Sequence, residues 1–110
     1  MYRIVCIEDS PTMRKLLQKT LAGEGYECLV AGTLAQGLKV CNEDKPDLIV
    51  LDVNLPDGNG IDLCRQIKEN QRLAHIPIVI LTGEAFSVEN RVEGIEAGTD
   101  VYVIKRNNMK

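Results

Sequence analysis

The sequence predicts an α/β fold in which a doubly wound, five-stranded parallel sheet carries helices on both faces. Three observations support this prediction. Short apolar runs rich in β-branched residues recur along the chain, they hardly alternate in polarity, and the segments between them carry apolar residues at helical spacing. The five runs are Ile4–Ile7, Cys28–Ala31, Leu48–Leu51, Ile78–Leu81 and Val101–Ile104.

The regular alternation of strands and helices also predicts how the strands are arranged. Crossovers between parallel strands are right-handed, which leaves few topologies to consider. Five strands favour the flavodoxin-like order 2-1-3-4-5. Ligands of such sheets bind outside the carboxyl ends of the strands, where the first and third strands lie next to each other. We therefore expect the functional residues there.

Capping residues mark the first two helices. Ser10 is an N-cap for a helix that ends at Gly23 and Gly25. Thr33 is the N-cap of a second helix, which stops before Pro46 because the residue preceding a proline disfavours helical geometry. Both helices carry an apolar stripe, which predicts that they pack on the sheet.

Two further helices are expected after the third and fourth strands. One runs over about residues 61–70, and the other carries Val88, Val92 and Ile95 before it ends near Gly98. Together these elements account for residues 1–110 as one domain, since 110 residues suit a single core.

Composition and charge exclude several classes of function. The chain is 45% hydrophobic and 26% charged, with a formal net charge of -3. The basic residues are scattered, so we expect no direct contact with nucleic acid. No apolar run approaches the roughly 18 residues of a membrane helix, and the N-terminus lacks the sections of a signal peptide. We therefore expect a cytoplasmic protein that does not bind membranes.

The four cysteines are interpreted as core side chains. Cys6, Cys28, Cys41 and Cys64 include no Cys-x-x-Cys pair, and each lies in an apolar run or stripe. We expect them to be reduced and buried. The single histidine, His75, has no partner at metal-ligand spacing and is interpreted as a loop residue.

Polar residues follow four of the five strands. The first strand leads into Glu8 and Asp9, the third into Asp52, the fourth into Thr82 and Gly83, and the fifth into Lys105. Three carboxylates at one edge of a sheet repel one another, and a hard divalent cation such as Mg²⁺ relieves this repulsion. A nearby hydroxyl and ammonium suit an anion with several oxygens, such as a phosphoryl group.

Asp52 is the best candidate nucleophile of this group. It ends the most continuous apolar strand, and the expected strand order places it beside the other acids. Acids also begin ordinary turns, and that interpretation is strong for any single residue. It is weak for four strands that all end in chemically matched groups. Asp57, Asp62 and Asp100 are assigned to turns, helix starts or the surface, without a functional role.

These residues resemble the receiver domain of two-component response regulators, and the resemblance covers nearly the whole chain. The matching motifs are Glu8-Asp9-Ser-Pro, Leu-Ile-Val-Leu-Asp52, Asp52-x-x-Leu55-Pro56-x-x-x-Gly60, Leu-Thr82-Gly83 and Ala97-Gly98-Thr-Asp-Val-Tyr102-Val-Ile-Lys105. Each motif is common by itself, whereas all of them in this order are highly specific.

The resemblance implies a set of roles around a magnesium ion. Asp52 would be the phosphoacceptor, Asp9 a direct metal ligand, and Glu8 a residue that acts mainly through metal-bound water. The backbone carbonyl of Asn54 would be a further ligand. The donor in this family is a histidine kinase or phosphotransfer protein, and the signal passes to an output domain or protein. Such a domain catalyses only its own phosphorylation and dephosphorylation and is not an enzyme with a separate substrate.

The resemblance also implies a phosphoryl-binding and switching group. Thr82 and Lys105 would bind the phosphoryl oxygens, and Gly83 would leave the group accessible and offer a backbone donor. Thr82 would then move toward the phosphoryl group while Tyr102 turns into the vacated space, which is a two-state switch. A simple packing role for Tyr102 remains an alternative.

Two features depart from the family pattern. Arg106 follows Lys105 where the family usually has a proline, commonly after a cis bond, and a cis bond to any other residue costs about 2.5–4 kcal/mol. Only six residues follow Ile104, where the fifth helix should begin. We expect the domain to be truncated before that helix, with uncovered apolar surface that could support a dimer.

Other functions remain as alternatives. A receiver-like interaction module that is not phosphorylated would not need Asp9, Asp52, Thr82 and Lys105 together. A flavin-binding relative would need a hydroxyl- and glycine-rich loop after the first strand, where this chain has acids. A hydrolase with an aspartyl intermediate would need a substrate pocket and cap.

Overall fold

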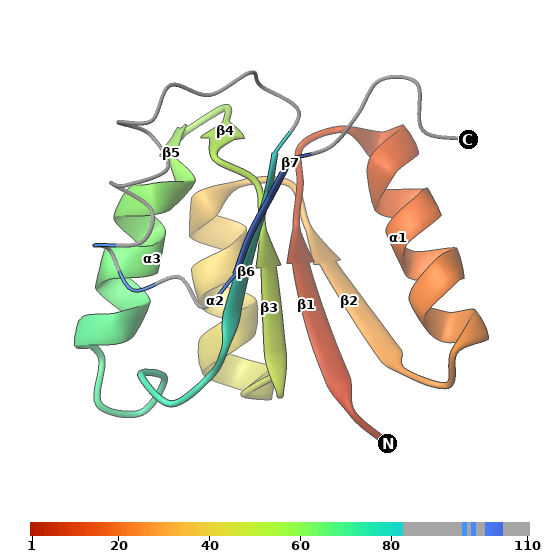
Figure 1. The fold of residues 1–110 in the computed structure, drawn as a ribbon, viewed down its shortest axis with the longest axis horizontal. Helices are drawn as coiled ribbons and strands as arrows, with labels where there is room; N and C mark the ends of the chain where they lie inside the picture. Colours follow the sequence, from red (N-terminus) through yellow and green to blue (C-terminus); the bar gives the residue numbers. More distant parts are fainter. Residues whose placement is uncertain (83–95, 97, 99–100, 105–110) are drawn as a thin grey trace.

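The computed structural model describes residues 1–82, 96, 98 and 101–104. Its main sheet has five parallel strands in the order β2-β1-β3-β6-β7, with β1 near the middle (Figure 1). The strands are β1 (Arg3–Ile7), β2 (Glu27–Ala31), β3 (Leu48–Leu51), β6 (Ile78–Thr82) and β7 (Val101–Ile104). The predicted order 2-1-3-4-5 is confirmed.

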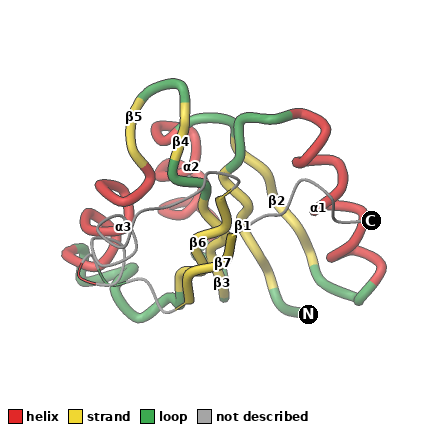
Figure 2. The backbone as a smooth tube through the Cα atoms, turned by 45° about the horizontal axis from the view of Figure 1, so that its top comes forward, coloured by secondary structure: helices red, strands yellow, loops and turns green. Residues whose placement is uncertain are grey.

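Three described helices cover the two faces of this sheet. They are α1 (Pro11–Gly23), α2 (Leu34–Asp44) and α3 (Gly60–Glu69). Figures 1 and 2 show α2 and α3 on one face and α1 on the other. The apolar residues of the fourth predicted helix, Val88, Val92 and Ile95, lie outside the described residues.

The predicted N-caps of the first two helices are confirmed. The Ser10 hydroxyl accepts a hydrogen bond from the backbone N–H of Met13 at 3.2 Å. The Thr33 hydroxyl accepts one from the N–H of Gln36 at 3.1 Å. These bonds satisfy donors that have no partner inside the helix. At the end of α2, Lys45 adopts a left-handed conformation with φ of 44°, which terminates the helix before Pro46.

A small hairpin between β3 and α3 was not predicted. No strand was predicted between Asp52 and the third helix, whereas the structure has the antiparallel pair β4 (Asn54–Leu55) and β5 (Gly58–Asn59). Strands of two residues are too short to show an alternating pattern. The Asn59 side chain then caps α3 by accepting from the N–H of Ile61 at 2.7 Å.

The core consists of two apolar layers, one on each face of the sheet. The larger layer lies beneath α2 and α3 and includes Ile7, Ile49 and Ile67. The smaller layer lies beneath α1 and contains Ile4, Cys6 and Cys28. The four cysteines are buried and form no disulfide, as predicted, and Sγ of Cys6 lies 3.6 Å from Sγ of Cys28.

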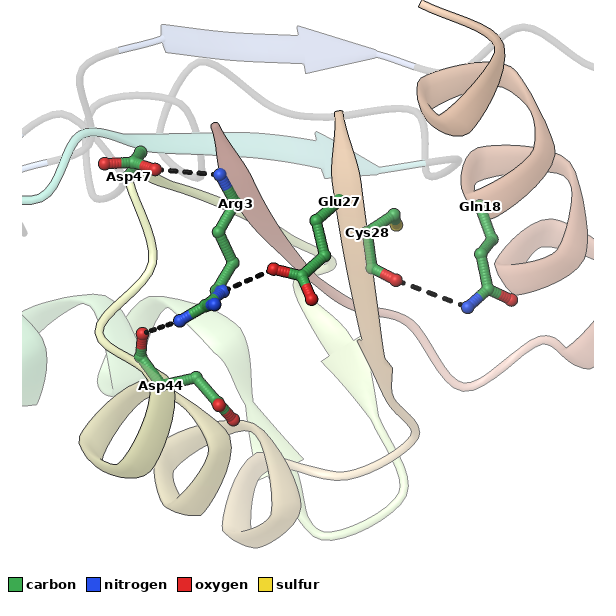
Figure 3. Close-up of polar contacts among 6 residues, drawn as sticks. All are labelled: Arg3, Gln18, Glu27, Cys28, Asp44 and Asp47. Carbon is green, nitrogen blue, oxygen red and sulfur yellow. Dashed lines mark hydrogen bonds and ion pairs between the residues drawn. The ribbon is translucent and has the colours of Figure 1, made fainter. Parts of the chain in front are cut away.

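The amino ends of the strands are held together by Arg3 at the start of β1 (Figure 3). Its guanidinium donates to the Glu27 carboxylate at 2.6 Å and to the carbonyl of Asp44 at 2.8 Å. Its backbone N–H donates to the Asp47 carboxylate at 2.8 Å. This network lies at the edge of the sheet opposite to the residues that follow the strands.

No helix in the described part of the chain is long and apolar enough to cross a membrane.

Candidate functional site

Three carboxylates meet at the carboxyl edge of the sheet. One oxygen from each of Glu8, Asp9 and Asp52 lies within 4.8 Å of the other two. Glu8 and Asp52 are buried, with exposed fractions of 3% and 8%, whereas Asp9 is exposed. The predicted cluster of acids is therefore present, with two members inside the protein and one at the surface.

The register of the parallel strands produces this cluster. Ile7 of β1 pairs with Leu51 of β3, so the residues that follow them, Glu8 and Asp52, come side by side. The backbone N–H of Asp52 donates to the carbonyl of Ile7 at 3.0 Å, and the N–H of Glu8 donates to the carbonyl of Ala31 at 2.9 Å. The site is thus attached to β1 and to both strands that flank it.

Local hydrogen bonds orient two of the carboxylates. Oε2 of Glu8 accepts from the N–H of Ser10 at 3.2 Å, which links Glu8 to the start of α1. Oδ1 of Asp52 accepts from the N–H of Asn54 at 3.3 Å. Gly60 lies against the main chain of Asp52, since a Cβ at residue 60 would overlap the Asp52 carbonyl oxygen. The loop after β3 therefore returns directly to the candidate nucleophile.

The electrostatics of the cluster favour a cation. Two carboxylates at most 4.8 Å apart repel each other by roughly 3 kcal/mol or more at an effective dielectric constant of about 20. All three donors are carboxylate oxygens, which bind hard divalent ions such as Mg²⁺ in preference to softer metals. The donor set therefore fits the metal that the sequence predicted.

The other predicted site residues fall at the edge of the described structure or beyond it. Thr82 is the last residue of β6, and Tyr102 lies in β7, where its backbone pairs with Ile80. Gly83 and Lys105 lie outside the described residues, as does Arg106. The phosphoryl-binding pair and the switch therefore remain predictions.

Two residues near the site were not predicted to support it. Nη1 of Arg14 donates to the carbonyls of Glu8 at 2.8 Å and Asp9 at 2.9 Å. The Asp57 carboxylate accepts from the N–H of Leu34, and this bond holds the pKa of Asp57 below its usual value. Asp57 was assigned to a turn, a helix start or the surface; it is exposed, and the helix it caps begins 23 residues earlier in the chain. No local sequence signal could have indicated that contact.

The sequence matches the family described as the response regulator receiver domain over residues 4–110. It is 40% identical over 103 residues to the DNA-binding response regulator MtrA of Mycolicibacterium smegmatis, covering 94% of this chain and 43% of that protein. It is 37% identical over 102 residues to the phosphate regulon transcriptional regulatory protein PhoB of Pseudomonas aeruginosa, covering 93% of this chain and 44% of that protein. The chain thus spans less than half the length of these relatives.

Solved structures show the same fold. The BeF3-activated receiver domain of Klebsiella pneumoniae RstA has a TM-score of 0.86 and 31% identity, covering 94% of this chain and 85% of that one. The chemotaxis protein CheY4 of Vibrio cholerae has a TM-score of 0.90 and 28% identity, covering 98% and 89%. With the strand order and the acid cluster, these matches show that the chain belongs to the response regulator receiver domains, which act in two-component phosphorelay signalling.

Proposed function

We propose that this receiver domain accepts a phosphoryl group on Asp52 and that Mg²⁺ is required for the transfer. The observation that carries the proposal is the convergence of Glu8, Asp9 and Asp52 within 4.8 Å at the carboxyl edge of a parallel sheet. Asp52 follows β3, which lies between β1 and β6, so it is central among the residues that follow the strands. Such a position suits a nucleophile that other groups must surround.

The metal would be held by the carboxylates of Asp9 and Asp52 and by the backbone carbonyl of Asn54, with Glu8 acting through a bound water. When bound, Mg²⁺ supplies charge neutralisation for the transferring phosphoryl oxygens. Asp9 is the one exposed acid among the three of the cluster, and it would face the side from which the ion enters. The buried acids would complete its coordination.

The residues of the chain then divide the reaction among them. A carboxylate oxygen of Asp52 attacks the phosphorus of a phosphohistidine, so a P–O bond forms as the P–N bond breaks. The histidine of the donor leaves with the electron pair of the broken bond and takes up a proton from solvent. The N–H of Asn54 stabilises the Asp52 carboxylate in its reactive orientation. Thr82 and Lys105 would bind the phosphoryl oxygens, with the backbone of Gly83 as a further donor.

The proposed partners follow from this chemistry. A histidine kinase or phosphotransfer protein would donate the phosphoryl group in the cytoplasm, and an output domain or separate protein would respond to it. Tyr102 would report the change at Thr82. Water would later hydrolyse the acyl phosphate, so the domain would catalyse its own modification and its reversal and no other reaction.

The test is phosphorylation by a small acyl phosphate in the presence of Mg²⁺, followed by measurement of the intact mass. We expect a mass increase of one phosphoryl group, its loss in Asp52→Asn, and its dependence on Mg²⁺. Asp62→Asn is the matched control, because Asp62 is an exposed acid that pairs with Arg65 at 3.2 Å and is not a member of the cluster. No added group, or equal labelling of Asp52→Asn, would favour the alternative of an interaction module that is not phosphorylated.

A further inference from the structure

The turn between β2 and α2 carries none of the proposed ligands, yet it is contacted by a side chain of one ligand-bearing loop, Asp57, and by a side chain hydrogen-bonded to the other, Arg14. We call residues 32–35, which lead into the first turn of α2, the β2–α2 turn. Asp57, in the hairpin after β3, binds it from one side, and Arg14, on α1, lies against it from the other. The metal-binding acids lie on the two loops that these side chains hold.

Asp57 fastens the tip of the hairpin to the beginning of α2. Its Oδ1 accepts from the N–H of Leu34 at 2.8 Å, and its Oδ2 accepts from the N–H of Ala35 at 3.1 Å. Gly58 packs beside this contact, since a Cβ there would lie 2.8 Å from Cδ1 of Leu34. Both carboxylate oxygens of Asp57 are therefore engaged by one helix, where the N–H groups and the helix dipole favour a negative charge.

The position of this hairpin determines where the Asn54 carbonyl lies. Asn54 pairs with Asn59 in the hairpin, and Leu55 beside it is buried. At its base, the hairpin is closed by the N–H of Gly60, which donates to the carbonyl of Val53 at 2.7 Å. The Asp57 contact closes it at its tip. Without the tip contact, Asn54 would be held by the base of the hairpin, by the burial of Leu55 and by its own bond to Asp52.

The Arg14 side chain holds the loop after β1 by binding the main chain of that loop. A single nitrogen, Nη1, donates to the carbonyls of Glu8 and Asp9, at 2.8 and 2.9 Å. The same nitrogen would lie 2.9 Å from a Cβ at Gly32, so the guanidinium fills the space that a side chain at residue 32 would need. The guanidinium thus bridges the acidic pair and the β2–α2 turn. Gln36 holds that turn from α2 by accepting from the N–H of Gly32 at 3.0 Å.

We propose that Asp57 and Arg14 are positioning residues of the metal site, which fix the two ligand-bearing loops relative to each other through the β2–α2 turn. The inference rests on the proposed function, because it assigns these residues to the same Mg²⁺ site. Neither side chain is one of the proposed ligands. Removal of either contact changes no ligand residue, but it allows the two ligand-bearing loops to move apart. The affinity for Mg²⁺ therefore falls.

The expected effect is a moderate loss of affinity. Residues that hydrogen-bond directly to metal ligands typically contribute about 10–100-fold. Asp57 and Arg14 act through the backbone, so we expect Asp57→Ala and Arg14→Ala each to raise the Kd for Mg²⁺ by roughly two- to tenfold. The Kd is measured by calorimetric titration of the purified chain, and phosphorylation by a small acyl phosphate is measured in parallel.

Arg14 gives a test of sign. Removal of a positive charge that lies against the main chain of Glu8 and Asp9 should strengthen cation binding if charge alone matters. Positioning predicts the opposite, because the loop is released. Arg14→Lys separates the two effects again, since it keeps the charge while its side chain is one atom shorter, so its ammonium falls short of the position from which Nη1 reaches both carbonyls. We expect both variants to bind Mg²⁺ more weakly.

The opposite edge of the sheet offers matched controls. Asp47 also binds a backbone N–H through its carboxylate, and Arg3 also donates to a backbone carbonyl. Asp47→Ala and Arg3→Ala should lower the thermal midpoint but change the Kd for Mg²⁺ by less than about twofold, because charges that far apart are largely screened.

The outcomes separate this inference from the function on which it rests. If the wild type binds Mg²⁺ and is phosphorylated while Arg14→Ala binds the ion equally or more tightly, the positioning role is wrong and the proposed function stands. The positioning role is also wrong if Asp57→Ala changes the Kd no more than Asp47→Ala does. If the wild type neither binds Mg²⁺ nor is phosphorylated, both proposals fail together.

Discussion

Substitution of Gly60 by alanine tests the packing on which the candidate site depends. Gly60 is the first residue of α3 and is buried. A Cβ there would overlap the backbone oxygen of Asp52 and lie 3.0 Å from the Asp52 carbonyl carbon. A flexible side chain could move away from such an overlap, whereas this main chain belongs to the loop that returns to the site. The substitution must therefore shift either the hairpin or α3.

The size of the effect is the difference between two opposing contributions. Alanine gains at most about 1 kcal/mol over glycine in a helix, and less at a first-turn position. Overpacking of a tight site costs about 1–3 kcal/mol, toward the upper end where backbone must move. We expect Gly60→Ala to lower the free energy of unfolding by about 1–2 kcal/mol. The thermal midpoint should fall by about 4–8 °C for each kcal/mol.

The same substitution in α1 provides the control. Gly23 is the last residue of that helix, and nothing lies within 4 Å of a Cβ placed on it. Gly23→Ala should therefore raise stability by about 0.4–1 kcal/mol, mainly by restricting the unfolded chain. Both variants are compared with the wild type by urea denaturation followed by circular dichroism. A Gly60→Ala protein as stable as the wild type would refute the packing argument.

Two further predictions concern a cap and a buried thiol. Ser10→Ala removes the acceptor for the Met13 N–H and should destabilise the fold by about 1 kcal/mol in urea denaturation, and Ser10→Asp should restore most of the loss. Burial raises the pKa of Cys41 from 9.0 to about 12, so its neutral form stabilises the fold below pH 9 and that stability is lost as the pH rises toward 12. Between these values the free energy of unfolding should fall by up to about 1.4 kcal/mol per pH unit for this thiol. Cys41→Ala should make the decline shallower, and an equally steep decline in that variant would contradict the assignment.

Sequence patterns predicted the parts of the site that depend on strand register. Glu8 and Asp52 each follow a continuous apolar run, and parallel pairing of those runs was enough to bring the two acids together. Ser10 and Thr33 were predicted as caps because capping requires only a hydroxyl just before an apolar stripe. The capping signals act within a few residues. The strand signals act through the pairing of whole strands, which the apolar runs predict.

The contacts that hold the loops were not predictable in the same way. The bond between Asp57 and Leu34 joins residues 23 positions apart and depends on how a short hairpin lies over a helix. Arg14 is a charged residue near the start of α1. Its contacts are with main-chain carbonyls, which no sequence pattern marks. Such contacts follow from the packing of elements that are already in place, so they become visible only in three dimensions.

The position of β1 between β2 and β3 has a consequence for the lifetime of the site. Residues 4–7 of this strand are buried and paired on both sides, and the N–H of Asp52 donates to Ile7. Amides in such strands exchange with solvent only when the whole domain unfolds, whereas helix ends and hairpins open locally. Deuterium should therefore enter the Asp52 amide at the rate of global unfolding, well after it enters the hairpin. Asp52 would keep its position while the loops around it open locally. A phosphoryl donor would then reach Asp52 without unfolding of the strands that hold it.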